Sequence, residues 1–170
     1  MGKASKYLAY GSNLHPLRLR ERQVSVELVQ TVPLPNWQLG FHKVGRDGSA
    51  KCSISPSSAP NAVVWCALYH IDSASIARLD RIEGLGSGYE RRHLQVDGHG
   101  TAYTYVASRS ATSQELRPFT WYRELVVAGA VYHSFPDLYV AELQATHAAE
   151  DPDRARAARH IELLRRLTSG

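Results

Sequence analysis

The pattern of apolar and polar positions divides this chain of 170 residues into a strand-rich first part and a helical last part. Residues 7–10 form a short apolar run that leads into a turn-forming Gly-Ser-Asn sequence. Residues 24–32 alternate between apolar and polar positions, as in a half-exposed strand, and we expect Pro33 and Pro35 to end it. Residues 62–71 are almost continuously apolar, which predicts a strand buried on both faces.

Other strands are predicted on either side of that buried segment. Residues 37–41 begin one strand, and the Gly-, Ser- and Pro-rich residues 45–61 predict a loop with a short strand at 51–54. Residues 90–96 and 101–107 flank the sequence Asp-Gly-His-Gly, which is typical of a hairpin turn. The first two thirds of the chain therefore favour a β-rich structure.

Helical periodicity appears once among the strands and then dominates the end of the chain. Asp72 or Ser73 is expected to cap a helix that runs to Ile82 and stops at Gly84. A basic stretch after Pro16 predicts one or two further helical turns. Three longer helices are predicted at 119–132, 136–146 and 153–167.

Strands followed by helices predict an α+β fold in which helices cover a strongly curved sheet. The length suits one domain over residues 1–170, with residues 151–170 as a peripheral C-terminal helix.

Composition excludes several classes of protein. With 44% hydrophobic and 21% charged residues the chain can form a core, so it is not disordered. No apolar run reaches the about 20 residues that span a bilayer, and the first six residues do not resemble a signal peptide. Cys52 and Cys66 are far apart, which excludes a disulfide scaffold and a cysteine zinc site and suits a reducing cytoplasm. The eight histidines show no HxxxH or HxH spacing, so no metal site is expected.

The formal charge of +4 raises the question of a nucleic-acid partner. Much of the excess comes from arginines after Pro16 and from arginines of the last helix, in segments apart from the candidate motifs described below. A solvated helix face explains such a series of arginines most simply. We therefore expect no nucleic-acid partner, and at most an attraction of an anionic substrate toward the protein.

The first candidate motif is the strand and turn made of Tyr7, Leu8, Ala9, Tyr10, Gly11, Ser12 and Asn13. A strand that runs into Gly-Ser-Asn lets the backbone turn sharply, with Gly11 free to adopt a positive φ. Successive N–H groups in such a turn can converge on an anion. A plain junction between strand and turn explains the same residues, so this motif does not define a site by itself.

The second candidate motif is the end of the helix predicted after Asp72. Ile76, Leu79 and Glu83 are spaced at i, i+3 and i+7, so they share one helix face and place a carboxylate at the end of an apolar stripe. Burial and the negative end of the helix both disfavour the ionised carboxylate, which suits a general base. The alternative is a solvated glutamate at a helix end, paired with Arg81.

Other side chains are weaker candidates. Asp80 lies off the apolar stripe, and Glu90 adjoins a pair of arginines. Ser12 lacks the G-x-S-x-G context of a nucleophilic serine, and Cys66 lies in the most apolar strand, where a thiolate is disfavoured. Several tyrosines could line a pocket with hydroxyls, although a buried tyrosine is more often a core residue: Tyr89, Tyr103, Tyr105 and Tyr122.

Taken together, the two motifs resemble the γ-glutamylcyclotransferase family, which includes AIG2-like proteins and an enzyme that removes γ-glutamyl groups in butirosin biosynthesis. The resemblance rests on Tyr-Gly-Ser-Asn-Leu at 10–14 and on Leu-Asp-x-x-Glu-Gly-x-x-x-Gly-Tyr at 79–89. It extends over nearly the whole chain, including segments 63–71, 104–106 and 121–130. The Tyr-Gly-Ser-Asn-Leu form is similar to the general branch of the family, and differs from the glutathione-specific and γ-glutamylamine branches.

The resemblance implies a small barrel-like mixed β-sheet with flanking helices and a cavity at one end. It implies a lactam-forming acyl-transfer or lyase activity, part of glutathione metabolism, that releases 5-oxoproline without a cofactor or metal. By matching positions, Glu83 would be the catalytic acid and base, and the loop from Tyr7 to Ser12, with Asn13 beside it, would hold the γ-glutamyl group. By the same matching of positions, three tyrosines would bind the substrate: Tyr89, Tyr105 and Tyr122.

Three alternatives stay open at this point. The first is a specialised γ-glutamyl-removing enzyme of one biosynthetic pathway, and the second is an inactive small-molecule-binding protein of the same fold. A nucleic-acid-binding domain is the third, and salt-dependent binding of DNA or RNA would reveal it. The expected partner is a small γ-glutamyl substrate, with no membrane and no nucleic acid, and the formation of a homodimer is left open.

Overall fold

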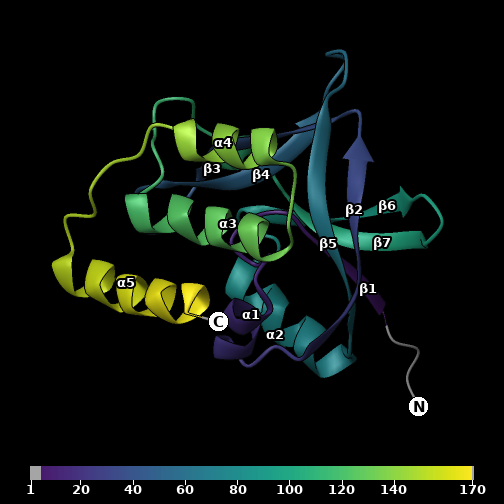
Figure 1. The fold of residues 1–170 in the computed structure, drawn as a ribbon, viewed down its shortest axis with the longest axis horizontal. Helices are drawn as coiled ribbons and strands as arrows, with labels where there is room; N and C mark the ends of the chain where they lie inside the picture. The colour runs from purple at the N-terminus through teal and green to yellow at the C-terminus, as the bar shows by residue number, and fades with distance from the viewer. Residues whose placement is uncertain (1–4, 170) are drawn as a thin grey trace.

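Five strands form a mixed sheet at the centre of the protein, seen in the computed structural model of residues 5–169 (Figure 1). The first four residues, which contribute to the expectation that no signal peptide is present, lie outside the described part of the chain. The sheet has the order β2-β5-β1-β7-β6, in which β1 pairs antiparallel with β5 and parallel with β7. The strands are β1 (Ser5–Ala9), β2 (Val26–Pro35), β5 (Val63–Ile71), β6 (Tyr89–Val96) and β7 (Gly100–Ala107).

The edge strand β2 corrects one expectation. Pro33 does not end it, because the strand continues past Pro33, opposite Trp65 of β5, and ends only at Pro35, opposite Val63. Proline has no N–H to donate, which excludes it from central strands but not from an edge. Within the described residues β2 pairs only with β5, so its other side requires no hydrogen bonds from these prolines.

Two further strands form a separate antiparallel ribbon, made of β3 (Trp37–Val44) and β4 (Ala50–Pro56). The short strand predicted at 51–54 is present as β4, but β4 has seven residues, so the loop predicted at 45–61 is shorter than expected. The backbone N–H of Ala107 in β7 donates to the Ser53 hydroxyl in β4 at 2.9 Å. This bond ties the ribbon to the end of the main sheet.

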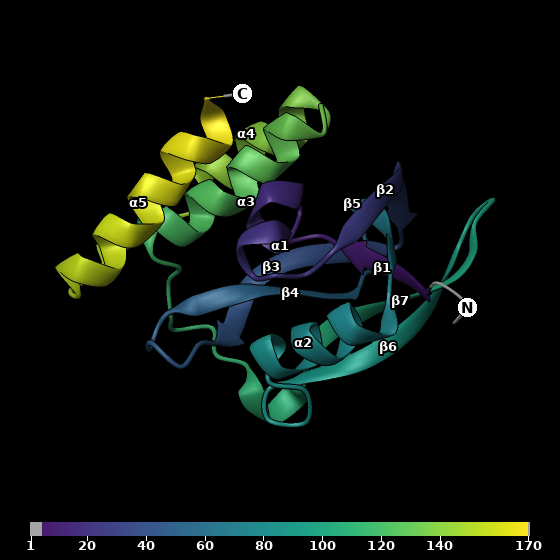
Figure 2. The ribbon, with the colours of Figure 1, turned by 90° about the horizontal axis from the view of Figure 1, so that it is seen from below.

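The helices lie on different sides of the strands, with α3, α4 and α5 grouped on one side and α2 on the other (Figure 2). Asp72 caps α2 as expected, since its side chain accepts a hydrogen bond from the backbone N–H of Ser75. The helix ends at Gly84, which adopts a φ of 66°. The α-helices are α1 (Pro16–Glu21), α2 (Ser73–Glu83), α3 (Thr120–Tyr132), α4 (Asp137–Ala145) and α5 (Arg154–Thr168), and Arg109–Ala111 form a 3₁₀ turn.

The α+β class, with a mixed sheet and flanking helices, is confirmed. The core is formed mainly by β1, β5, β7 and α3, in which side chains such as Leu8, Leu68 and Leu125 are completely buried. Among residues 5–169 no helix combines the length and the apolar character that crossing a bilayer requires.

Helix α3 fixes the loop that follows β1. A Cβ atom on Gly129 would lie 2.4 Å from the Leu14 Cβ, so only glycine lets the helix approach this loop so closely. The Leu14 carbonyl accepts a hydrogen bond from the Tyr69 hydroxyl at 2.5 Å, and a ring nitrogen of His133 lies 2.8 Å from it. The loop is thereby held from both the sheet and α3.

A buried carboxylate joins the last helix to α3. The Asp151 side chain accepts hydrogen bonds from the indole N–H of Trp121 at 2.8 Å and from the guanidinium of Arg156 at 2.7 Å. The bond from Arg156 is the main reason why the pKa of Asp151 lies well below its usual range. Removal of this carboxylate leaves the buried Trp121 N–H without its acceptor and the partly exposed Arg156 guanidinium without its closest carboxylate.

We expect Asp151→Asn to lower the free energy of unfolding by about 1–3 kcal/mol at neutral pH, because a charge-assisted pair is lost. Since the folded-state pKa of Asp151 is depressed, its contribution is complete above the unfolded pKa of about 4 and is lost as the pH falls below it. Urea unfolding between pH 7 and pH 2 measures this difference. The exposed Glu162→Gln is the matched control, and an equal loss in both variants would contradict a special role for Asp151.

Candidate active site

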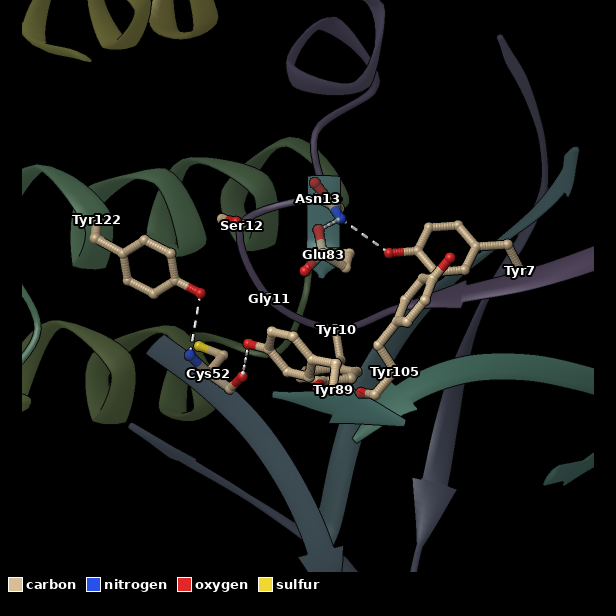
Figure 3. A pocket seen from close by; sticks show the side chains of 10 residues that line it. All are labelled: Tyr7, Tyr10, Gly11, Ser12, Asn13, Cys52, Glu83, Tyr89, Tyr105 and Tyr122. Carbon is tan, nitrogen blue, oxygen red and sulfur yellow. Dashed lines mark hydrogen bonds between the residues drawn. The ribbon is translucent and has the colours of Figure 1, made fainter. Parts of the chain in front are cut away.

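A small polar cavity lies where the loop after β1 meets β4 and the end of α2 (Figure 3). It has an empty volume of about 310 Å³, including the part that opens to solvent. Seven of its lining residues come from the two motifs, which are distant in the sequence, and three more come from segments that neither motif covers. The lining residues are Tyr7, Tyr10, Gly11, Ser12, Asn13, Cys52, Glu83, Tyr89, Tyr105 and Tyr122.

Glu83 is the carboxylate of this cavity, and two donors hold it in place. The Asn13 amide N–H and the Arg22 guanidinium each donate to Oε1 at 3.0 Å, and the Glu83 side chain is 15% exposed. Oε2 accepts no hydrogen bond from the described residues. One oxygen is therefore used to orient the carboxylate, while the other remains free to accept a proton.

The partner of Glu83 is not Arg81, which the solvated alternative suggested, but Arg22 at the end of α1. Arg22 also donates to the Asn13 side-chain oxygen at 2.8 Å, so the three side chains form one network. The expectation that the arginines after Pro16 lie apart from the candidate motifs is therefore wrong. The turn between β1 and α1 brings this basic segment back to the end of α2, which the sequence pattern did not indicate.

The two competing carboxylates lie outside the cavity lining. Asp80 accepts a hydrogen bond from the Tyr105 hydroxyl at 2.6 Å and another from Arg91, which together occupy both of its oxygens. Glu90 is exposed and lies 3.4 Å from Arg92 at the surface. Among the described residues, Glu83 is thus the carboxylate that lines this cavity.

Two of the predicted substrate-binding tyrosines use their hydroxyl protons within the protein. Tyr89 donates to the Cys52 carbonyl at 2.6 Å, and Tyr105 donates to Asp80. Tyr10 likewise donates to the backbone carbonyl of Tyr105. These three tyrosines line the cavity. Because their hydroxyl protons are already donated within the protein, their oxygens can accept a hydrogen bond from a ligand but cannot donate one.

Tyr7 and Tyr122 have the opposite arrangement. The Tyr7 hydroxyl accepts a hydrogen bond from Asn13, and the Tyr122 hydroxyl accepts one from the Cys52 N–H, both at 3.0 Å. Neither bond uses the hydroxyl proton. Burial raises the pKa of both phenols well above the usual value, so they stay protonated. They are the two tyrosines whose protons are best placed to bind a ligand.

The loop after β1 offers backbone donors. The N–H groups of Gly11, Ser12 and Asn13 make no hydrogen bond to any described residue, although all three residues are buried. Gly11 does not adopt the positive φ that the sequence suggested. Glycine is required for another reason, because a Cβ there would lie 3.0 Å from the Cys52 Cβ. The adjacent Leu8 and Ala9 are buried in β1 and do not line the cavity.

Cys52 is a cavity residue that sequence reasoning missed. Its N–H donates to the Tyr122 hydroxyl and its carbonyl accepts from the Tyr89 hydroxyl, so its backbone positions two of the tyrosines that line the cavity. Burial raises the pKa of its thiol to about 12, which leaves no nucleophilic thiolate near neutral pH. A backbone role of this kind carries no residue-type signal in a sequence.

The fold and the cavity define the class of protein, an α+β domain in which one carboxylate, buried phenols and a loop of free N–H groups surround a small polar space. A family model described as the AIG2-like family matches residues 63–143. The chain is 25% identical to a mouse γ-glutamylcyclotransferase, over 88% of this chain and 82% of that protein. It is also 25% identical to a γ-glutamyl cyclotransferase of Aspergillus oryzae, over 86% of this chain but only 62% of that protein's length.

A solved structure described as a γ-glutamyl cyclotransferase has the same fold, with a TM-score of 0.81 and 21% sequence identity. The match covers 96% of this chain and 99% of the other. The chain is thus similar in sequence to AIG2-like proteins and to γ-glutamylcyclotransferases, and it shares the fold of a γ-glutamyl cyclotransferase.

Proposed function

We propose that this protein is a γ-glutamylcyclotransferase that uses Glu83 as its acid and base. The observation that carries the proposal is the position of Glu83. It is a cavity carboxylate with one oxygen held by Asn13 and Arg22 and the other oxygen free. A γ-glutamyl group has an anionic α-carboxylate and a γ-carbonyl, which the free N–H groups of Gly11 and Ser12 and the Tyr122 hydroxyl suit as donors.

In the proposed reaction the α-nitrogen of the γ-glutamyl group attacks its own γ-carbonyl carbon. The new C–N bond closes a five-membered lactam, and the bond from the γ-carbon to the leaving nitrogen breaks. The α-ammonium must first lose a proton to Glu83, and the leaving nitrogen takes up the two protons that the α-nitrogen gives up in total. Nucleophile and electrophile belong to one molecule, so the protein contributes mainly folding of the substrate and proton transfer.

The loop and the phenols would then serve different steps. The backbone N–H groups after β1 would hold the substrate by fixed hydrogen bonds and stabilise the oxyanion that develops on the γ-carbonyl oxygen. Tyr7 donates no proton within the described network, so it could anchor the glutamyl group beside Asn13. The proposed place of action is the cytoplasm, which fits two free, buried cysteines.

The test is incubation of the protein with a panel of γ-glutamyl amino acids, glutathione and γ-glutamyl amines, with measurement of 5-oxoproline. We expect 5-oxoproline and the free amine in equal amounts from at least one member of the panel. Release of glutamate instead would indicate hydrolysis and contradict the proposal. Binding of the panel without any product would favour the inactive binding protein.

A further inference from the structure

A second, larger cavity continues from the first on the side of Glu83. It has an empty volume of about 830 Å³ and shares four lining residues with the small cavity, namely Ser12, Glu83, Tyr89 and Tyr122. If the γ-glutamyl group occupies the small cavity, the leaving group must extend into the larger one. The composition of the larger cavity therefore bears on which leaving groups the protein accepts.

This larger cavity is strongly basic. Six arginine and lysine residues line it, against the two carboxylates of Asp47 and Glu83. Three of the six cations already have a carboxylate partner, in the pairs Arg22–Glu83, Lys51–Asp47 and Arg156–Asp151. The other three are Arg18, Lys43 and Arg46, and none of these has a carboxylate within 4 Å among residues 5–169.

Two of these three cations are also poorly solvated. The Nε of Arg18 is buried without a hydrogen-bond partner, and burial, together with Arg22, lowers the pKa of Arg18 to about 9. Lys43 is 9% exposed, and its ammonium lies 4.8 Å from the centre of the Tyr89 ring. Burial lowers the pKa of Lys43 as well. Charged groups held this way without a counter-ion are unfavourable, so a bound anion would stabilise them.

We propose that the larger cavity selects γ-glutamyl conjugates whose leaving amine carries at least two negative charges, as a dicarboxylic amino acid does. This inference rests on the proposed function and goes beyond it by naming the leaving group. A single carboxylate, present in every amino-acid leaving group, would satisfy one cation and leave two without partners. A second carboxylate can pair with a second of these cations, so a leaving group with two negative charges matches the charge of the cavity better.

The experiment compares γ-glutamyl-glutamate with γ-glutamyl-glutamine, two substrates that differ in one charge and hardly in shape. We expect kcat/KM for 5-oxoproline release to be about tenfold or more higher for γ-glutamyl-glutamate, with a ratio that falls as salt is added. A ratio near one, or a preference for γ-glutamyl-glutamine, would overturn the inference but leave the cyclotransferase assignment intact. Absence of 5-oxoproline from both substrates and from the wider panel would instead overturn the assignment.

Variants locate the effect in the cavity. Lys43→Met and Arg46→Gln should each bring the ratio of the two kcat/KM values toward one. Arg165→Gln, on the exposed face of α5, changes the net charge equally and should leave the ratio as it is in the parent protein. An equal change of the ratio in all three variants would mean long-range attraction rather than a binding cavity, and would overturn the inference.

Discussion

Replacement of Glu83 by glutamine should lower 5-oxoproline formation at least about 1000-fold without unfolding the protein. The expected size follows from general acid–base catalysis, which typically contributes factors of about 100 to 10,000. Glutamine keeps the shape of the side chain, and its amide oxygen can still accept the hydrogen bonds from Asn13 and Arg22. The lost function is the uptake of a proton by the free oxygen, which an amide cannot perform at neutral pH.

The control for this variant is Glu90→Gln, which makes the same chemical change on an exposed side chain outside the cavity. We expect Glu90→Gln to retain the parent rate. Glu83→Gln should still bind the substrate, as measured by calorimetry, with a melting temperature close to that of the parent. Full 5-oxoproline release by Glu83→Gln would remove the basis of the proposed mechanism.

The sequence predicted the parts of this site that depend on local geometry. The i, i+3, i+7 spacing of Ile76, Leu79 and Glu83 fixes which helix face Glu83 shares, and Leu79 is fully buried as that spacing requires. The end of the helix at Gly84 and the turn after β1 are likewise local properties of a few residues. Patterns of this kind depend on backbone periodicity, which the sequence expresses directly.

The parts that the sequence did not predict arise from contacts between distant segments. Arg22 is one of several arginines after Pro16, and nothing in their spacing indicates which one reaches Glu83, 61 residues away. Cys52 acts through its backbone, so its residue type gives no indication of its role. The prolines of β2 fit within a strand because β2 lies at the edge of the sheet, and that position is a property of the whole topology that the local pattern does not express.

The hydrogen bonds of the cavity tyrosines distinguish a substrate-binding hydroxyl from a structural one, which residue type alone could not do. Tyr122→Phe should lower kcat/KM about 10- to 100-fold, because it removes a buried hydroxyl whose one hydrogen bond within residues 5–169, from the Cys52 N–H, leaves its own proton available to a ligand. Tyr105→Phe removes a hydroxyl that already donates to Asp80, so we expect a smaller loss of activity. Its main effect should be a loss of stability of about 1 kcal/mol.

Steady-state kinetics and urea unfolding of both variants separate the two roles. If Tyr122 binds the substrate, kcat/KM falls while the free energy of unfolding changes little beyond the loss of one bond from the Cys52 N–H. A larger loss of activity in Tyr105→Phe than in Tyr122→Phe would contradict this assignment. That result would mean that the direction of the hydroxyl's hydrogen bond does not identify the substrate-binding tyrosines of this protein.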